Sequence, residues 1–278
     1  MTTLVTGATA NIGRYVVDHL LAEGVTDIRA LTVSPARAAL PDGVEPVVGH
    51  IGRPHTLDGV FDGVERMYLA PAAEAGSTVE AMRLAVAAGV RQVVATDGPP
   101  QSWWGDQYRA VEGAVEVAGE SGGLEVTHLW PGEFMENFTM WSHQTKVRDV
   151  VRDAYPDAAN AAIAMTDIAA VAARCLTSEG HAGRSYGLTG PDSLTRRQRV
   201  AAIAEALGRP ILYEEVSREE AIVELEPEMG ESAAWYVDLQ PLMIDGPQPV
   251  DPTFEHVMGA PATSFVQWVR DHASRFQP

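Results

Sequence analysis

The sequence predicts an α/β protein with a doubly wound parallel sheet, followed by a smaller C-terminal α/β lobe. Three observations lead to this fold class. Short β-rich runs alternate with single amphipathic helices over the first half of the chain. A glycine-containing turn, LVTGATANIG at residues 4–13, joins the first run to the first helix. After Trp130 the alternation becomes irregular, which indicates a second, smaller part.

The elements of the first half follow from two hydrophobic periods. Apolar side chains at positions 12, 16, 17, 20 and 21 share one face of the first helix, which Gly24 ends. The predicted strands are 3–6, 28–33, 44–48, 66–70, 90–95 and 124–129, and the predicted helices are 11–22, 55–60, 77–88 and 106–119. Because single helices separate the strands, we expect right-handed crossovers and a parallel sheet.

The second half is less regular. After an aromatic and polar stretch at 131–152, the predicted elements are a strand at 161–165, a helix at 167–176, a strand at 184–188, a helix at 195–207, a strand at 211–215 and a helical tail ending in 265–276. We assign residues 1–153 to the sheet domain, with 161–190 returning to it. Residues 154–278 would form a lobe that caps the carboxyl ends of the strands, the edge where open α/β sheets bind ligands.

Composition restricts the class of partner. The 278 residues include 20 Lys and Arg against 38 Asp and Glu, a net charge of −18. This charge repels phosphate backbones and anionic lipids, so we expect neither nucleic acid nor membrane as the partner. The single cysteine, Cys175, cannot form an internal disulfide, and no signal peptide or membrane span is visible. We therefore expect a cytoplasmic protein, and the His, Cys, Asp and Glu spacings predict no metal site.

The turn after the first strand has the context of a dinucleotide-binding motif. Gly7 follows the strand directly and Gly13 lies in the first turn of the helix, whose N-terminus offers free N–H groups to a pyrophosphate. The middle glycine of the usual pattern is Ala10 here. Its methyl group is a small obstacle at negative φ and a larger one at positive φ. The expected cofactor contacts in this turn are Gly7, Thr9, Ala10, Asn11, Ile12, Gly13 and Arg14.

The end of the second strand indicates which cofactor binds. An acid there would hydrogen-bond the ribose hydroxyls of NAD, but the strand ends in Leu31-Thr32-Val33-Ser34. Arg14, Ser34 and Arg37 could surround a 2′-phosphate instead. This favours NADP(H), while NAD(H), or arginines that bind no ligand, remain as alternatives.

Six segments together resemble the NmrA-like branch of the atypical short-chain dehydrogenases/reductases, which have a Rossmann-type fold. They are LVTGATANIGRYVVDHLLAEG, the stretch from LTVSPARAAL to VERMYLA, VTHLWPGEFMENF, MTDIAAVAARCL, YGLTGPDSLTRRQRVAAIAEALGRPILY and TSFVQWVRDHASRF. The resemblance implies an NAD(P)H-dependent quinone, ketone or imine reductase, or a cofactor sensor without turnover. It also places His50 and Ile51 near the adenine. Four positions depart from the family pattern: Ala10, Val33, His50 and Trp130.

The expected catalytic residues follow the fifth strand. Short-chain reductases commonly use a Tyr-x-x-x-Lys helix with Ser or Thr on the preceding strand, the tyrosine giving a proton to the carbonyl. Tyr108 and Thr96 occupy such positions, and Thr96 is also an expected cofactor contact, but Glu112 stands where the lysine would be. A carboxylate there opposes phenolate formation. Asp97 at the strand tip is a second candidate.

The expected substrate contacts are aromatic. Trp103 and Trp104 lie in the loop after the fifth strand, where they could stack on a flat substrate or anchor the lobe. The resemblance implies that the segment after the sixth strand lines the pocket, with Phe134, Asn137 and Trp141 as contacts. His143 in this segment is a candidate acid or base. His128, inside the sixth strand, is expected to be structural.

We therefore predict an NADP(H)-dependent reductase of a small aromatic or polycyclic carbonyl or quinone, in secondary metabolism. A homodimer is compatible with the sequence. Two alternatives remain. One is a non-catalytic NAD(P)H-binding redox sensor, and the other is a cofactor-independent acid–base enzyme, such as a cyclase or dehydratase, on the same scaffold.

Overall fold

The computed structural model describes residues 1–99, 106–120 and 123–277, and it forms two compact units. Unit 1 comprises Met1–Pro131 and Met165–Leu188, and unit 2 comprises Gly132–Ala164 and Thr189–Pro278. The expected boundary at 153/154 differs from this division. Residues 132–153 belong to unit 2, because their apolar side chains, including Phe138, Trp141 and Val151, are buried in its core.

Unit 1 contains the predicted doubly wound sheet. Among the described residues it has seven parallel strands in the order β3-β2-β1-β4-β5-β6-β9. Their bounds are β1 Thr2–Val5, β2 Ile28–Thr32, β3 Val44–Val48, β4 Val64–Leu69, β5 Gln92–Thr96, β6 Glu125–Pro131 and β9 Arg184–Leu188. From β1 the chain adds β2 and β3 on one side and then β4, β5 and β6 on the other side, so the strand order reverses at β1. This is the switch point where dinucleotides bind in doubly wound folds.

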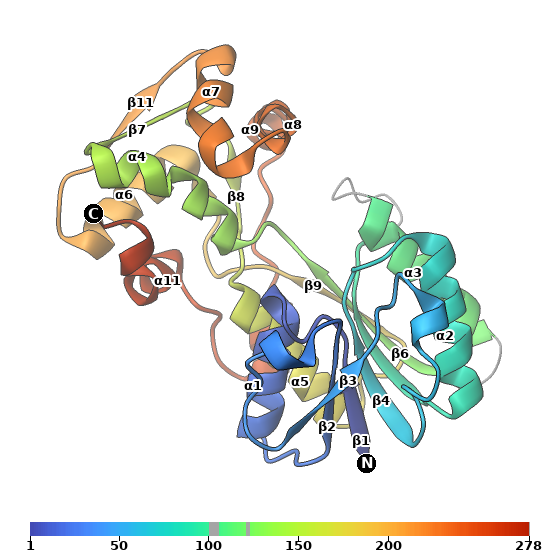
Figure 1. The fold of residues 1–278 in the computed structure, drawn as a ribbon. Coiled ribbons are helices and arrows are strands. Elements are labelled where there is room, and N and C mark those ends of the chain that lie inside the picture. Colours follow the sequence, from blue (N-terminus) through green and yellow to red (C-terminus); the bar gives the residue numbers. More distant parts are fainter. Residues whose placement is uncertain (100–105, 121–122, 278) are drawn as a thin grey trace. The chain divides into compact units, whose positions relative to one another are not determined.

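Two pairs of helices cover the sheet of unit 1. Helix α1 (Asn11–Ala22) packs with α5 (Met165–Thr177), and α2 (Ala75–Ala88) packs with α3 (Asp106–Glu120). Figure 1 shows the two pairs on opposite faces of the sheet. The sheet face under α2 and α3 is apolar, with Leu4, Met67 and Val93 packed against Met82 and Val111. The predicted helix at 55–60 is only a short 3₁₀ turn, Pro54–Thr56.

Unit 2 consists of short elements around its own core. Two strand pairs, parallel β7–β11 and antiparallel β8–β10, accompany its helices. The bounds are 3₁₀ helix η3 Met135–Trp141, α4 Ser142–Val147, β7 Val150–Asp153, β8 Ala159–Asn160, β10 Leu194–Thr195, α6 Arg196–Leu207, β11 Leu212–Glu215, α7 Arg218–Met229, α8 Ser232–Leu239, α9 Leu242–Asp245, α10 Thr253–Met258 and α11 Phe265–Asp271. Throughout the described ranges, no helix is long and apolar enough to cross a membrane.

The predicted strand at 161–165 is wrong. The strand of this region is β8, and the following residues make one isolated bridge, between Ile163 and Phe134. Ile163 N donates to Glu133 O at 2.8 Å and Met135 N donates to Ile163 O at 2.9 Å. Apolar β-branched and alanine residues looked like a buried strand, but burial of their side chains in unit 2, rather than a sheet ladder, explains their apolarity.

Buried charges organise the core of unit 2. Arg196 pairs with Asp153, and Asp153 Oδ2 also accepts a 2.7 Å hydrogen bond from Trp141 Nε1. Arg199 Nη2 donates to Asn160 Oδ1 at 2.6 Å. All five side chains are buried, and each has a polar partner inside the same unit. Buried charges need such partners, so these contacts specify how α6 packs on β7 and β8.

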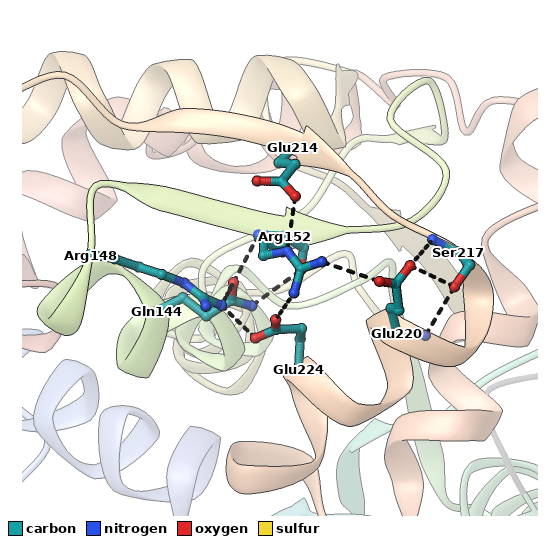
Figure 2. A network of polar contacts seen from close by, with 7 residues as sticks. All are labelled: Gln144, Arg148, Arg152, Glu214, Ser217, Glu220 and Glu224. Atoms are coloured by element: carbon teal, nitrogen blue, oxygen red, sulfur yellow. Dashed lines mark hydrogen bonds and ion pairs between the residues drawn. The ribbon is translucent and has the colours of Figure 1, made fainter.

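A half-exposed network ties β7, β11 and α7 together. Figure 2 shows Arg152 on β7 between three carboxylates from the two neighbouring elements. Arg152 Nη1 lies 2.6 Å from Glu224 Oε1, Nε lies 3.0 Å from Glu214 Oε1, and Nη2 lies 3.3 Å from Glu220 Oε1. Arg148 also pairs with Glu224. Because one guanidinium serves three carboxylates, its loss would leave several like charges facing one another.

Candidate functional site

The turn between β1 and α1 requires both of its retained glycines. Gly7 has φ +62°, and a Cβ atom there would lie 3.0 Å from Ala70 Cβ. A Cβ on Gly13 would lie 2.6 Å from the carbonyl carbon of Gly7 and 2.8 Å from the carbonyl oxygen of Thr6, and nearer still to the carbonyl oxygen of Gly7. Gly13 therefore lets helix α1 approach the backbone of the turn closely, as the dinucleotide motif requires.

Ala10 fits the turn without strain. Its φ of −111° and ψ of 174° lie in the extended region that any residue adopts. Ala10 N donates to Gly7 O at 2.9 Å, and no side chain caps the helix that begins at Asn11. Thr9, Ala10 and Asn11 are exposed. The alanine in place of the middle glycine therefore does not distort the turn, and the N–H groups of the first helical turn are available to a phosphate.

A cavity of about 240 Å³ lies beside this turn in unit 1. Its lining residues come from the turn, from the ends of β2 and β3 and from the loop after β4: Gly7, Thr9, Ala10, Leu31, Thr32, Val33, Gly49, His50, Ile51 and Ala72. His50 Nδ1 accepts a 2.9 Å hydrogen bond from Gly52 N, which orients the ring. Ile51 is buried. The lining contains no carboxylate, so nothing in it would repel a 2′-phosphate.

The two arginines expected near a 2′-phosphate do not line this cavity: Arg14 lies on α1 and Arg37 in the 3₁₀ turn after β2. Arg14 Nη1 donates to Ala39 O at 2.7 Å, and Arg14 Nε pairs with Asp18 at 3.3 Å. This contact joins α1 to the loop that follows the 3₁₀ turn Pro35–Arg37. Arg37 is exposed, and Ser34 N is held by Thr32 Oγ1 at 3.2 Å. The residues of the turn, the cavity and this loop thus fit a dinucleotide with an additional phosphate.

Thr96 is placed differently from the prediction. It is fully buried, and its Oγ1 pairs with Tyr68 OH at 2.8 Å. Its hydroxyl thus joins β4 to β5 and is not presented to a cofactor. Tyr108 lies on α3 as expected, and burial raises its pKa. The structure therefore holds Tyr108 as a neutral phenol, in agreement with the absence of a lysine one turn later.

Asp97 lies directly after β5 with a partner that the sequence did not reveal. His128 Nδ1, on the neighbouring strand β6, is 2.6 Å from Asp97 Oδ2. Burial raises the pKa of Asp97 to about 6, although the hydrogen bond and charge of His128 act in the opposite direction. The pKa of His128 is also raised: burial lowers it, but the hydrogen bond and charge of Asp97, and the charges of Glu112 and Glu116, outweigh that effect.

The remaining predicted residues lie in unit 2 or outside the described residues. Phe134 and Asn137 are half-buried, and Asn137 N donates to Phe134 O at 3.1 Å, which places them one 3₁₀ turn apart. His143 is exposed on α4. Trp141 is fully buried in the core, with its N–H on Asp153, so it has no surface for a substrate and that prediction is wrong. Trp103 and Trp104 lie outside the described residues.

Comparison with known proteins gives a family and several relatives. A family model described as NAD(P)H-binding matches residues 7–179. A (4-alkanoyl-5-oxo-2,5-dihydrofuran-3-yl)methyl phosphate reductase of Streptomyces griseus subsp. griseus is 33% identical, over 99% of both chains. An NAD(P)H azoreductase of Xenophilus azovorans is 30% identical, over 98% of both. The crystal structure of an NADPH-dependent quinone oxidoreductase of Escherichia coli superposes with a TM-score of 0.83 at 25% identity, covering 99% of this chain and 100% of that one.

Proposed function

This chain belongs to the NAD(P)H-binding family, in the NmrA-like branch of the atypical short-chain dehydrogenases/reductases, and from that membership we propose that it is an NADP(H)-dependent reductase. Its substrate would be a small aromatic or polycyclic carbonyl or quinone. The observation that carries the proposal is the Gly7–Gly13 turn, whose close packing and free helix N-terminus are those of a working dinucleotide site.

The choice of NADP(H) rests on charge around the cavity. Arg37 follows β2 in the 3₁₀ turn Pro35–Arg37, and Arg14 on α1 donates to Ala39 O just after that turn. The cavity lining itself has no acid that could select an unphosphorylated ribose. The bound cofactor supplies the hydride. The chain would hold its pyrophosphate at the N-terminus of α1 and its adenosine half between Val33, His50 and Ile51. Among the proposed proton donors, Asp97 has the support of its position at the tip of β5.

The substrate class draws on the relatives. Their printed substrates are an acylated oxo-dihydrofuran, an azo compound and a quinone, all of them conjugated and electron-poor. A hydride adds most readily to such a system. We propose Phe134 and Asn137 as contacts for a flat substrate, with His143 as a further acid or base of unit 2. We also propose a cytoplasmic enzyme, because the single cysteine, Cys175, is a free buried thiol that can form no internal disulfide. A homodimer is the proposed assembly.

Cofactor titration tests this proposal. Purified protein is titrated with NADPH and NADH by tryptophan quenching, and NADPH oxidation is then followed with a panel of quinones and aromatic ketones. We expect tighter binding of NADPH and turnover with at least one acceptor. No binding at millimolar NADPH would overturn the proposal. Tight binding without any turnover would replace the reductase with a cofactor sensor.

A matched pair of variants makes the cofactor test specific. Val33 lines the cavity with 61% of its surface exposed, and Val147, in unit 2, is exposed to 65%. Val33→Asp places a carboxylate at the end of β2, where repulsion of about 1–2 kcal/mol should weaken NADPH binding about tenfold. NADH binding should be unchanged or stronger. Val147→Asp adds the same charge and should change neither affinity.

A further inference from the structure

Asp97, His128 and Glu112 form a cluster of ionisable side chains in unit 1. Asp97 follows β5, His128 lies on β6, and Glu112 lies on α3. Asp97 is 1% exposed and Glu112 is 8% exposed. His128 Nδ1 lies 2.6 Å from Asp97 Oδ2, and Glu112 acts on both of these side chains through its charge. Its register follows from the sheet, because Ala95 and His128 are paired on the neighbouring strands.

One carboxylate oxygen of this buried pair has no hydrogen-bond partner among the described residues. Asp97 Oδ1 is buried and makes no hydrogen bond among the described residues. Trp130 Nε1, two residues after His128 on the same strand, is likewise buried without a partner there. The Trp130 indole lies near the carboxylate and lowers the pKa of Asp97 as a hydrogen-bond donor would, although no contact between the two meets the geometry of a hydrogen bond. Buried polar atoms normally have hydrogen-bond partners. The lack of a partner for Asp97 Oδ1 and for Trp130 Nε1 is therefore explained by a ligand oxygen that binds there, or by a proton on the carboxyl group.

Among the residues that the structure describes, the other ionisable groups that act on the pair are carboxyl groups and phenols. Glu112 and Glu116 from α3 act on His128. Tyr68 from β4 faces Asp97, but its hydroxyl is engaged by Thr96 and burial raises its pKa far above the usual range. Tyr108 from α3 lies near Tyr68 and is also a neutral phenol. The surrounding charges are therefore mainly those of carboxylates, and they raise the pKa values of both Asp97 and His128, so that both groups keep their protons to higher pH.

We propose that Asp97 and His128 form a proton-holding pair in which Asp97 Oδ1 carries the proton given to the reduced substrate and His128 positions the carboxyl group. This role rests on the proposed reductase function. Glu112, which stands where a lysine would acidify Tyr108, instead keeps the proton on the pair. The pair thus replaces the tyrosine–lysine couple that this chain lacks.

The proton step balances as follows for a carbonyl substrate. Bound NADPH would supply the hydride for the new C–H bond, and the carbonyl π electrons would move to the substrate oxygen. That oxygen takes the proton from Asp97 Oδ1 as the carboxyl O–H bond breaks. The resulting Asp97 carboxylate is stabilised by the protonated His128 at Oδ2, and a solvent proton later restores the carboxyl group. His128, 13% exposed, is the member of the pair open to water.

The first test needs no turnover. Protein labelled with ¹³C in histidine rings is titrated from about pH 4 to 9 by nuclear magnetic resonance, with His128→Asn assigning the resonance. We expect His128 to titrate above the ordinary histidine range, and Asp97→Asn to lower its pKa. Glu125→Gln, an exposed carboxylate at the other end of β6, should leave it unchanged. A His128 resonance that titrates identically in wild type and Asp97→Asn would overturn the pair.

The second test uses the pH profile of turnover of 9,10-phenanthrenequinone with NADPH. Asp97 must be protonated to act, so kcat should fall as the pH rises through about 6. His128 lowers the pKa of Asp97 and Glu112 raises it, so His128→Asn should move this limb to higher pH and Glu112→Gln to lower pH. Asp97→Asn should lose about 100-fold or more in kcat, since general acids contribute about that much, with KM little changed.

The outcomes separate the two proposals. A wild type that turns over no acceptor would overturn the reductase and, with it, the donor role of Asp97. A wild type that turns over while the three variants keep its pH limb would overturn the donor role alone. If Asp97→Asn does not fold, as judged by circular dichroism, the Glu112→Gln limb still decides, because this variant keeps the Asp97–His128 contact intact.

Discussion

Gly13→Ala is the sharpest test of how the cofactor turn is built. In an unstrained helix, alanine stabilises relative to glycine by about 1 kcal/mol. At Gly13, however, the added methyl would lie 2.6 Å from the Gly7 carbonyl carbon and 2.8 Å from the Thr6 carbonyl oxygen. These are backbone atoms of the tight turn after β1, and they cannot rotate away as a side chain can. We therefore expect the overpacking term of about 1–3 kcal/mol or more to exceed the helix gain.

Gly113→Ala is the matched control. Gly113 lies within α3 of the same unit, and a Cβ there would meet no atom within 4 Å. Only the helix term remains, so this variant should be more stable than wild type by about 0.5–1 kcal/mol. For a unit of this size, 1 kcal/mol shifts the melting temperature by about 2–4 °C.

The assay is thermal unfolding of both variants followed by far-ultraviolet circular dichroism, with NADPH affinity as a second readout. The two melting temperatures should move in opposite directions, down for Gly13→Ala and up for Gly113→Ala. Gly13→Ala should also weaken NADPH binding, since the turn and the N-terminus of α1 must separate to admit the methyl. A Gly13→Ala protein as stable as Gly113→Ala would refute the reasoning.

Three further predictions follow from other parts of the chain. Ala10→Gly should change NADPH affinity by less than about threefold, because φ at Ala10 is already negative; a large gain in a fluorescence titration would contradict this. Trp141→Phe should destabilise by about 1–3 kcal/mol in urea unfolding, since it leaves a buried aspartate oxygen without its indole donor. Trp235→Phe, at an exposed position of α8, should lie within about 0.5 kcal/mol of wild type. Arg152→Ala should lower the melting temperature by more than Arg270→Ala, which removes one exposed ion pair. Because salt screens charges, the difference between the two variants should become smaller as NaCl is raised from about 0.05 to 0.5 M. A difference in melting temperature that salt does not change would show that Arg152 acts through packing rather than charge.

Much of unit 1 could be predicted because its signals are local. The predicted bounds of α1, β3 and β9 coincide with those of the structure. The fold class, the resemblance to the family and the class of NAD(P)H-dependent oxidoreductase are confirmed. Periodicity and turn chemistry act over a few residues, so they can be read without the tertiary structure. The roles of the site residues remain proposals.

Unit 2 was harder to predict because its apolar residues are explained by distant partners. Trp141 looked like a pocket aromatic, yet Asp153 and the core of unit 2 satisfy both its polar and its apolar parts. Residues 161–165 looked like a strand, although only Ile163 makes a bridge. Neither a period nor a motif indicates which side chain twelve or more positions away will accept a hydrogen bond.

Ala10 illustrates the difference between what the sequence determines and what only the tertiary structure determines. The sequence by itself determined the doubly wound sheet, the glycine turn and the family, because strand–turn–helix order, glycine positions and hydrophobic periods are properties of neighbouring residues. Whether a methyl is tolerated at Ala10 depends on one backbone dihedral, and only the structure shows that φ there is −111°. Likewise, Asp97 and His128 are 31 positions apart, and only the parallel register of β5 and β6 brings them within 2.6 Å. Such contacts arise from tertiary packing, which local sequence rules do not encode.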